Sequence, residues 1–285
     1  MEIERKKLLS ELSTFSIGGP AAHFASVKNI SEMKEAFAYA KEHSLKTIIV
    51  GKGSNTLFSD LGFDGLVIQN KIDSIETDGK GLYTAGGGFS FALLGQRSAR
   101  DGFSGLEFAS GIPATVGGAI FMNAGAQNQE TKDTLLWVDY LSLDGTLKRY
   151  PKDSLVFSYR SSSFQKMQGA IVTAAFQTSP DPQASSRQRE LIEYRLKTQP
   201  YKDKSCGCIF RNPTGGSAGA LIDQAGLKGM RVGGAEVSPM HANFIVNRGH
   251  ATAHDVLELM NQVRARVYET SGVHLESEVR LVDSI

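Results

Sequence analysis

The sequence has few cysteines and no long apolar run. Among its 285 residues are two cysteines, Cys206 and Cys208, with a single residue between them. They are too close for a framework disulfide, and no second pair supplies the other ligands of a zinc site. No stretch reaches the roughly 18 apolar residues of a membrane span, and the charged N-terminus lacks the apolar run of a signal peptide. We therefore expect a cytoplasmic protein with no metal and no membrane span.

An excess of charge of either sign is also missing. The chain has 31 Lys and Arg against 30 Asp and Glu, a formal net charge of +1. A general nucleic-acid binder usually carries a basic stripe or tail, so this balance favours a small-molecule partner and argues against nucleic acid. The sequence does not determine the oligomeric state, and a monomer is assumed.

Glycine, in contrast, is abundant and clustered. The 30 glycines exceed the average share of roughly 7%. One cluster, GKGSN at 51–55, lies between predicted buried strands at 47–50 and 65–70. Its amides and Lys52 suit a phosphate, although an ordinary tight turn has the same pattern. The loop does not open a helix, so it is not a Rossmann fingerprint.

A second cluster, SGIPATVGGAIFMNAGA at 110–126, carries almost no side-chain bulk. Such a tract predicts backbone wrapped closely around a large flat or extended ligand, and a packed glycine-rich loop is the alternative. Together with GKGSN it suits a diphosphate and an attached ring system. The pattern over 102–126 predicts neither helix nor strand.

Elsewhere the hydrophobic periodicity predicts a mixture of helices and strands. Ser31 is the expected N-cap of the first helix, and Met33, Ala36, Phe37 and Ala40 form its expected core face. Thr252 and Asp255 predict a capping-box start for the last helix, and Gly272 its end. Asp144-Gly145, between the strands predicted at 135–143 and 146–150, predicts a two-residue hairpin turn. The stretch 179–186, rich in proline and small polar residues, is the expected linker. Helices are predicted at 31–45, 89–102, 186–198 and 252–271, and strands at 47–50, 65–70, 81–88, 135–143, 146–150, 170–177 and 274–282.

Seven motifs in chain order resemble those of the MurB-type reductases, the UDP-N-acetylenolpyruvoylglucosamine reductases. The resemblance implies an α+β fold: a FAD-binding domain of the vanillyl-alcohol-oxidase/PCMH type, then a smaller α+β substrate-binding C-terminal domain. The implied domains are 1–180, with subdomains at about 1–70 and 71–180, and 186–285, whose last strand returns to the active site. The motifs are FSIGGPA (15–21), GKGSN (51–55), the 110–126 tract, SYRSSSF (158–164), CGCIFRNP (206–213), HANFIVN (241–247) and LESEV (275–279).

The resemblance also implies a reaction. NADPH would reduce a non-covalently bound FAD, and flavin N5 would pass a hydride to C3 of the enolpyruvyl group of a UDP-sugar, giving the peptidoglycan precursor UDP-N-acetylmuramate. No tyrosine-bearing insertion lies between Ala170 and Ser186, so the chain resembles the shorter class, which lacks a covering loop. The implied FAD-binding residues are Gly51, Lys52, Gly53, Ser54, Asn55, Ser110, Gly111, Thr115, Gly117, Gly118, Ala119 and Asn123.

Arg160 and Glu278 match two catalytic positions of the family. A fixed guanidinium at Arg160 would stabilise the charge that builds as the hydride arrives, and a structural salt bridge is the alternative. Glu278 would act with Arg160 on the enol carboxylate or through the proton relay. Its alternative is a surface ion pair with Arg280.

Cys208 departs from the family pattern, which usually places a proton-donating serine at this position. A thiol with a reference pKa of about 8.5 is mostly protonated at neutral pH and is more acidic than an alcohol, so we expect the role to be conserved. A thiol is also open to oxidation and alkylation. The alternative is a small buried hydrophobe, which is the role expected of Cys206. The implied substrate-binding residues are Tyr159, Arg211, Asn212, His241 and Asn243.

Two other functions fit parts of the sequence. A different oxidoreductase on the same FAD scaffold would not need Arg160, Cys208 and Glu278 together. A nucleotide-binding module without chemistry would need only the two glycine clusters. Absorption by a bound flavin and turnover that depends on the UDP-sugar distinguish these possibilities.

Overall fold

The computed structural model describes residues 1–283, which form two compact units. The first unit consists of Met1–Glu4, His23–Gly51 and Gly65–Arg195, and the second of Arg5–Ala22, Lys52–Asp64 and Leu196 onward. The chain passes from one unit to the other within β1 (Glu4–Leu8), β2 (Pro20–Val27), β5 (Phe63–Asn70) and helix α4 (Ala184–Thr198), and after β3 (Thr47–Val50). Each unit is therefore built from segments that are far apart in sequence.

In the first unit, helix α1 (Ile30–Glu42) belongs to a core shared with strands β2 and β5. Strands β2, β5 and β3 are neighbours in that order, and β3 runs parallel to β5. The predicted core face of α1, which includes Met33 and Phe37, is buried. The predicted N-cap Ser31 is wrong: Asn29 accepts from the N–H of Glu32 at 2.9 Å. The Glu32 side chain also accepts from the N–H of Lys28 at 2.7 Å and from Asn29 Nδ2 at 3.0 Å, which ties the start of the helix to the residues before it.

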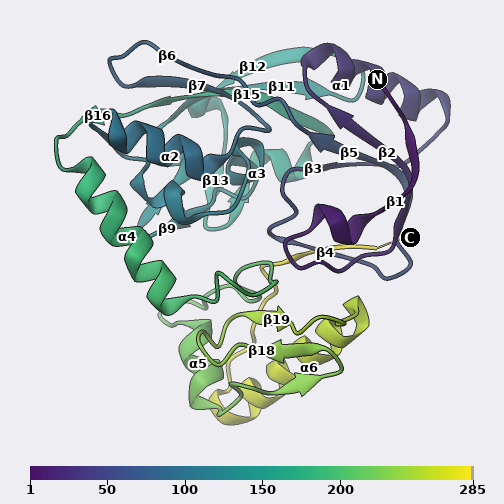
Figure 1. The fold of residues 1–285 in the computed structure, drawn as a ribbon, viewed down its shortest axis with the longest axis vertical. Helices are drawn as coiled ribbons and strands as arrows, with labels where there is room; N and C mark the ends of the chain where they lie inside the picture. Colours follow the sequence, from purple (N-terminus) through teal and green to yellow (C-terminus); the bar gives the residue numbers. More distant parts are fainter. Residues whose placement is uncertain (284–285) are drawn as a thin grey trace. The chain divides into compact units, whose positions relative to one another are not determined.

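A five-stranded sheet forms the rest of this unit's framework, in the order β12-β11-β15-β7-β6 (Figure 1). The predicted hairpin at Asp144-Gly145 is confirmed by the antiparallel pairing of β11 with β12, with Gly145 at φ +85. Helix α2 (Phe91–Arg100) and the sheet share one apolar core, and Gly102 follows the helix at φ +84. The strands are β6 (Ile75–Thr77), β7 (Leu82–Gly86), β11 (Leu135–Ser142), β12 (Leu147–Pro151) and β15 (Gly169–Gln177).

The glycine-rich tract folds into short elements that no periodicity predicted. It contains the 3-10 helix η2 (Glu107–Gly111) and the short helix α3 (Val116–Phe121), which pack into the same core as α2. The remaining short elements of this unit are β8 (Phe103–Ser104), β9 (Gly125–Ala126), β10 (Gln129–Glu130), η3 (Thr131–Asp133), η4 (Lys152–Ser154), β13 (Phe157–Ser158), β14 (Ser161–Ser162), η5 (Ser163–Lys166) and β16 (Ser179–Pro180).

The segment expected to be a linker is ordered. Strand β16 pairs with β8, and α4 begins at Ala184 with the Arg187 side chain bonded to buried Glu107 at 2.8 Å. The division into a FAD-binding domain and a substrate-binding domain near residue 180 stays a prediction, because compactness alone does not assign a function to either unit.

The second unit is organised around helix α6 (Ala253–Ser271), whose apolar face enters one core with Phe15 and Leu57. The predicted capping box of Thr252 with Asp255 and the left-handed Gly272 at φ +70 are confirmed. The other elements of this unit are η1 (Leu9–Leu12), β4 (Thr56–Phe58), α5 (Ala218–Gln224), β17 (Arg231–Val232), β18 (Ala235–Val237), β19 (Ile245–Asn247) and β20 (Arg280–Val282).

The predicted strand over 274–282 is too long. Regular pairing occurs only in β20, which runs parallel to β4 with Leu281 opposite Leu57. Before β20, Ser277 makes an isolated bridge to Phe210, so this segment pairs with two different partners in succession. A change of partner interrupts the regular ladder and shortens the strand.

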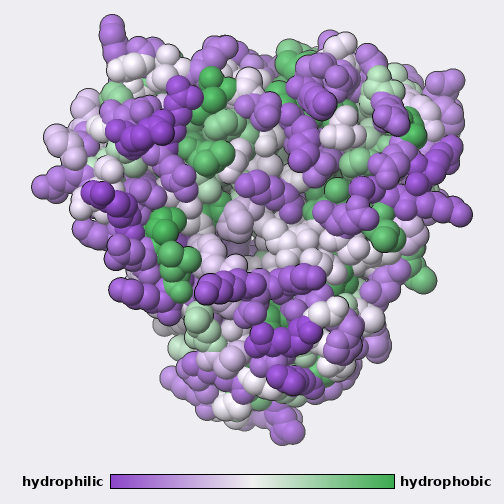
Figure 2. Space-filling view, viewed as in Figure 1, coloured by the Kyte–Doolittle hydropathy of each residue, from purple (hydrophilic) through white to green (hydrophobic). Residues whose placement is uncertain are grey.

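The surface drawn in Figure 2 is mainly hydrophilic, with apolar side chains in small separate groups. Among the helices of the described chain, none combines the length and the apolar character needed to cross a membrane.

Replacing Leu259 by alanine tests the core of the second unit. Leu259 is completely buried on α6, so its truncation should lower the free energy of unfolding by about 2–5 kcal/mol. The exposed Glu269 on the same helix is the control, and Glu269→Ala should change stability by less than about 0.5 kcal/mol. Urea unfolding measures both. Equal losses in the two variants would contradict the assignment of this core.

Candidate active site

The first unit brings Gly51, at the end of β3, against Thr115 of the glycine-rich tract. A Cβ on Gly51 would lie 2.3 Å from Thr115 Oγ1, which is far inside contact distance. Thr115 also caps α3 by accepting from the N–H of Gly118 at 3.2 Å. The two predicted cofactor elements therefore meet where glycine is the residue that fits.

The loop from Lys52 to Asn55 belongs to the second unit. Gly53 has φ +60, and a Cβ there would lie 2.1 Å from the carbonyl oxygen of Leu12. Lys52 is exposed, whereas Ser54 and Asn55 are partly buried. The loop therefore offers glycine backbone and one cationic side chain.

The tract from Ser110 to Asn123 contributes mostly backbone to its surroundings. Ser110 is 6% exposed, and its Oγ has no hydrogen-bond partner. Gly117 and Ala119 add little or no side chain, and Gly117 approaches the carbonyl of Gly87 closely. Asn123 is fully buried and bonds inside the protein, donating to Ser158 O at 3.0 Å and accepting from Lys132 N at 3.1 Å.

Arg160 forms a tight turn with Tyr159 between β13 and β14. Its φ of +56 is uncommon for a residue other than glycine, and such strain occurs often at functional sites. The guanidinium donates to the carbonyl of Gly125 at 3.2 Å and lies 4.9 Å from the centre of the Tyr159 ring. Tyr159 and Arg160 thus lie beside the end of the glycine-rich tract.

Cys208 and Glu278 come together in the second unit through Ile209. The N–H of Glu278 donates to Ile209 O at 2.8 Å, and Cys208 makes an isolated bridge to Phe244. Asn55 of the glycine loop also joins this group, because its Nδ2 donates to Glu278 O at 3.2 Å. Both Cys208 and Glu278 are partly exposed.

Cys206 has a different environment from Cys208. It is 1% exposed and belongs to the core of the second unit, and burial raises the pKa of its thiol far above the ordinary value. A neutral buried thiol behaves as a small hydrophobe. Within residues 1–283, no cluster of His, Cys, Asp and Glu is suited to hold a metal ion.

Of the predicted substrate-binding residues of the second unit, Arg211 and Asn212 follow Cys208 in the chain, and Asn243 is hydrogen-bonded to Ile209 and to His241. His241 is half-buried, accepts from the N–H of Asn243 at 3.3 Å and packs edge-on against Phe244. Asn212 is exposed and accepts from Ala218 N at 3.0 Å. Arg211 has a buried Nε without a hydrogen-bond partner, a polar group that an oxygen-rich ligand would satisfy.

The sequence missed one side chain that packs against the predicted cofactor tract. Arg195 of α4 lies over Gly111, where an added Cβ would be 2.5 Å from Arg195 Cδ. In sequence, Arg195 is one of several charges on a polar helix, so only its position in space distinguishes it.

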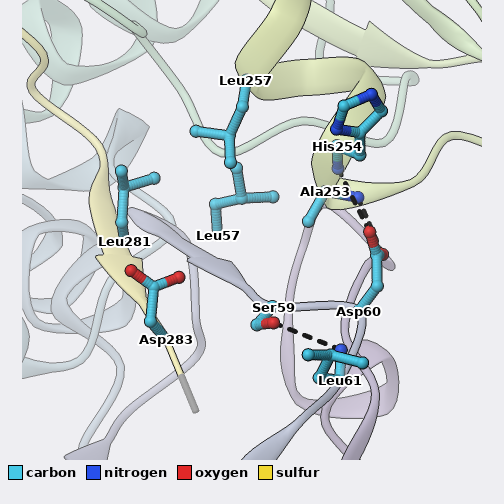
Figure 3. Close-up of a pocket in the computed structure, with 9 residues that line it drawn as sticks. All are labelled: Leu57, Ser59, Asp60, Leu61, Ala253, His254, Leu257, Leu281 and Asp283. Carbon is cyan, nitrogen blue, oxygen red and sulfur yellow. Dashed lines mark hydrogen bonds between the residues drawn. The ribbon is translucent and has the colours of Figure 1, made fainter. Parts of the chain in front are cut away.

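A cavity of about 190 Å³ in the second unit lies elsewhere (Figure 3). It is next to the start of α6, where the Asp60 carboxylate accepts from the N–H groups of Ala253 and His254 at 2.8 and 3.1 Å. None of the nine residues drawn is a predicted site residue. They are Leu57, Ser59, Asp60, Leu61, Ala253, His254, Leu257, Leu281 and Asp283.

Each unit taken by itself has features that suit a FAD. In the first unit, Gly51 allows close backbone approach and Ser110 has a buried hydroxyl without a hydrogen-bond partner. In the second unit, Gly53 allows close backbone approach and Lys52 carries a charge that suits a diphosphate. Both sets are typical of the flavoprotein class.

Comparison with known proteins agrees with this class. Residues 21–150 match a FAD binding domain, and residues 199–282 match the C-terminal domain of UDP-N-acetylenolpyruvoylglucosamine reductase. The predicted α+β fold, with a FAD-binding domain of the PCMH type and a reductase C-terminal domain, is confirmed. The chain is a FAD-dependent reductase that takes its electrons from NADPH.

The reductases of two chlamydial organisms are similar over nearly the whole chain. The UDP-N-acetylenolpyruvoylglucosamine reductase of Protochlamydia amoebophila is 52% identical, over 96% of this chain and 92% of the relative. That of Chlamydia trachomatis serovar A is 50% identical, over 96% and 94%. The crystal structure of the MurB reductase from Thermus caldophilus is 40% identical, with a TM-score of 0.84 over 99% of both chains. The chain belongs to the MurB family of UDP-N-acetylenolpyruvoylglucosamine reductases.

Replacing Gly51 by alanine tests the contact between the two cofactor elements. The new methyl group would overlap Thr115 Oγ1, so the loop has to shift and FAD should bind about tenfold more weakly or worse. Flavin fluorescence titration of the apoprotein measures this. Gly216→Ala is the control, because its Cβ would make only an ordinary contact with Pro213 Cγ at 3.6 Å. Unchanged affinity in Gly51→Ala would refute the assignment.

Proposed function

We propose that the chain reduces UDP-N-acetyl-3-O-(1-carboxyvinyl)-glucosamine to UDP-N-acetylmuramate, a step in peptidoglycan precursor synthesis in the cytoplasm. The observation that carries this proposal is the pairing of the Cys208 and Glu278 segments through Ile209, inside the region that matches the reductase C-terminal domain. The chemistry that bound FAD supplies is delivery of a hydride from its N5 to C3 of the enolpyruvyl group.

Cys208 gives the proton to C2 in this proposal. Cys208 is partly exposed. A thiol with a reference pKa of about 8.5 is mostly protonated at neutral pH, so it can give its proton to C2 once the hydride has reached C3 and C2 has become basic. Cys206 cannot act as this proton donor, because its side chain is buried in the core.

Arg160 and Glu278 act on the substrate carboxylate and on the charge that develops beside it. The Arg160 guanidinium is partly fixed by the Gly125 carbonyl and the Tyr159 ring, so it stabilises the enolate-like charge with little reorganisation. The backbone of Glu278 is tied to Ile209 and Asn55, which supports a defined place for its carboxylate in the proton relay.

Four residues are proposed to bind the UDP-sugar. Arg211, with its partnerless buried Nε, suits the diphosphate, because a guanidinium bonds phosphate oxygens in a fixed planar geometry. Tyr159 is 43% exposed, and Asn212 and His241 offer further polar groups. We take the working form to be a monomer that requires neither nucleic acid nor a membrane.

Anaerobic spectroscopy with the substrate tests the reaction. We expect a flavin absorption band that is bleached by NADPH and restored only when the UDP-enolpyruvyl sugar is added, because that compound is the hydride acceptor. A protein that stays colourless after incubation with FAD would point to a nucleotide-binding module. A reduced flavin that ignores the sugar but is reoxidised by a small carbonyl compound would point to a different oxidoreductase.

Substitutions of Cys208 test the identity of the acid. Cys208→Ala should lower turnover by about 10²-fold or more, since a positioned general acid contributes roughly 10²–10⁴-fold, while flavin reduction by NADPH stays normal. Cys208→Ser should keep much of the activity and become resistant to alkylating reagents. Stopped-flow measurement of the two half-reactions separates these effects, and an alanine variant with the turnover of the parent would refute the donor role.

A further inference from the structure

The side-chain amide of Asn243 makes two hydrogen bonds to the backbone of a single residue, Phe210. Asn243 is 3% exposed, and its Nδ2 donates to Phe210 O at 2.8 Å while its Oδ1 accepts from Phe210 N at 3.0 Å. One amide thus satisfies both polar groups of Phe210, as a neighbouring strand would. Because the side chain is also almost completely buried, it presents little surface to a substrate.

Main-chain hydrogen bonds extend this contact to Ile209. Ile209 N donates to Asn243 O at 2.9 Å, and Ile209 O accepts from Glu278 N at 2.8 Å. Ile209 is therefore held by Asn243 on one side and by Glu278 on the other. The residue immediately before it is Cys208, which bridges to Phe244.

The surroundings of Asn243 leave it little freedom to move. Its own N–H donates to His241 Nδ1 at 3.3 Å, and its buried side chain is hydrogen-bonded at both ends of the amide. Asn243 thus also connects the Cys208 segment to His241.

We propose that Asn243 is a positioning residue for the reduction, and that it holds the thiol of Cys208 at a defined place relative to Glu278. The inference rests on the proposed function, and it replaces the sequence-based expectation that Asn243 binds the substrate. An ionised Asp has acceptors alone and Leu has neither donor nor acceptor, so neither can reproduce both bonds that the Asn243 amide makes to Phe210.

Asn243→Asp is the first test, because it keeps the shape and replaces the donor by an acceptor that faces Phe210 O. We expect kcat to fall about tenfold or more, with KM for the UDP-sugar changed less than about threefold and flavin reduction by NADPH unchanged. A solvent deuterium isotope effect on kcat should appear or increase, since proton transfer becomes slower. A large rise in KM with kcat preserved would overturn the proposal and make Asn243 a substrate ligand.

A double substitution tests whether Asn243 acts through Cys208. In the Cys208→Ala background the thiol is gone, so adding Asn243→Asp should reduce kcat by less than about twofold further. An additional loss as large as that in the parent background would show that Asn243 acts independently of the thiol, and would refute the proposal.

Alkylation of Cys208 by iodoacetamide gives a readout that needs neither cofactor nor turnover. In Asn243→Asp, loosening of the segment should change the rate of alkylation at Cys208 about tenfold. Asn261→Asp is the control and should leave this rate unchanged, because Asn261 lies on the exposed face of α6 and Asp keeps its acceptor oxygen. If the parent protein fails to turn over the UDP-sugar, the proposed function fails, but this rate still tests the positioning.

Asn243→Ser guards against loss of folding in the Asp variant. Serine is small and can make one of the two bonds to Phe210, so its kcat and alkylation rate should lie between those of the parent and those of Asn243→Asp. A folded serine variant with parental kcat and parental alkylation rate would overturn the proposal.

Discussion

The candidate acid centre depends on the hydrogen bonds that enclose Ile209 and Phe210. Three segments, 206–212, 241–247 and 275–279, meet there, and none of them forms a regular sheet with the others. Isolated bridges alone leave many backbone groups to be satisfied individually. The Asn243 amide and the Glu278 N–H supply part of what is missing, so the backbone that carries Cys208 is defined by a few specific bonds.

In the first unit, the corresponding constraint is the close packing of glycine backbone against neighbouring groups. Gly51 lies against Thr115, Gly117 against Gly87, and Gly111 under the side chain of Arg195. At each contact a Cβ would enter space that another group already occupies or closely limits. The low bulk of the glycine-rich tract is therefore a packing requirement within the unit, and it leaves backbone available to a flat, extended cofactor.

The sequence predicted elements that are defined by local chemistry. Helix α6 was predicted from its capping box and terminal glycine, and the hairpin of β11 and β12 from Asp144-Gly145. The sequence-based predictions were wrong where a neighbouring residue made the helix cap instead, or where a segment distant in the chain determined the strand pairing. Asn29, and not Ser31, caps α1, and the last predicted strand is shortened because residues before β20 pair with the Phe210 segment.

The order of the motifs alone identified the class of reductase, and it singled out Cys208 from Cys206, because each motif is a short run of residue types that can be read locally. Which groups those residues contact was decided only by the tertiary structure. Asn243 looked like a substrate ligand in its motif, but its amide is bound to Phe210, 33 positions away. A hydrogen-bond partner so distant in the chain has no periodic signal in sequence, since it exists only after the segments have packed together.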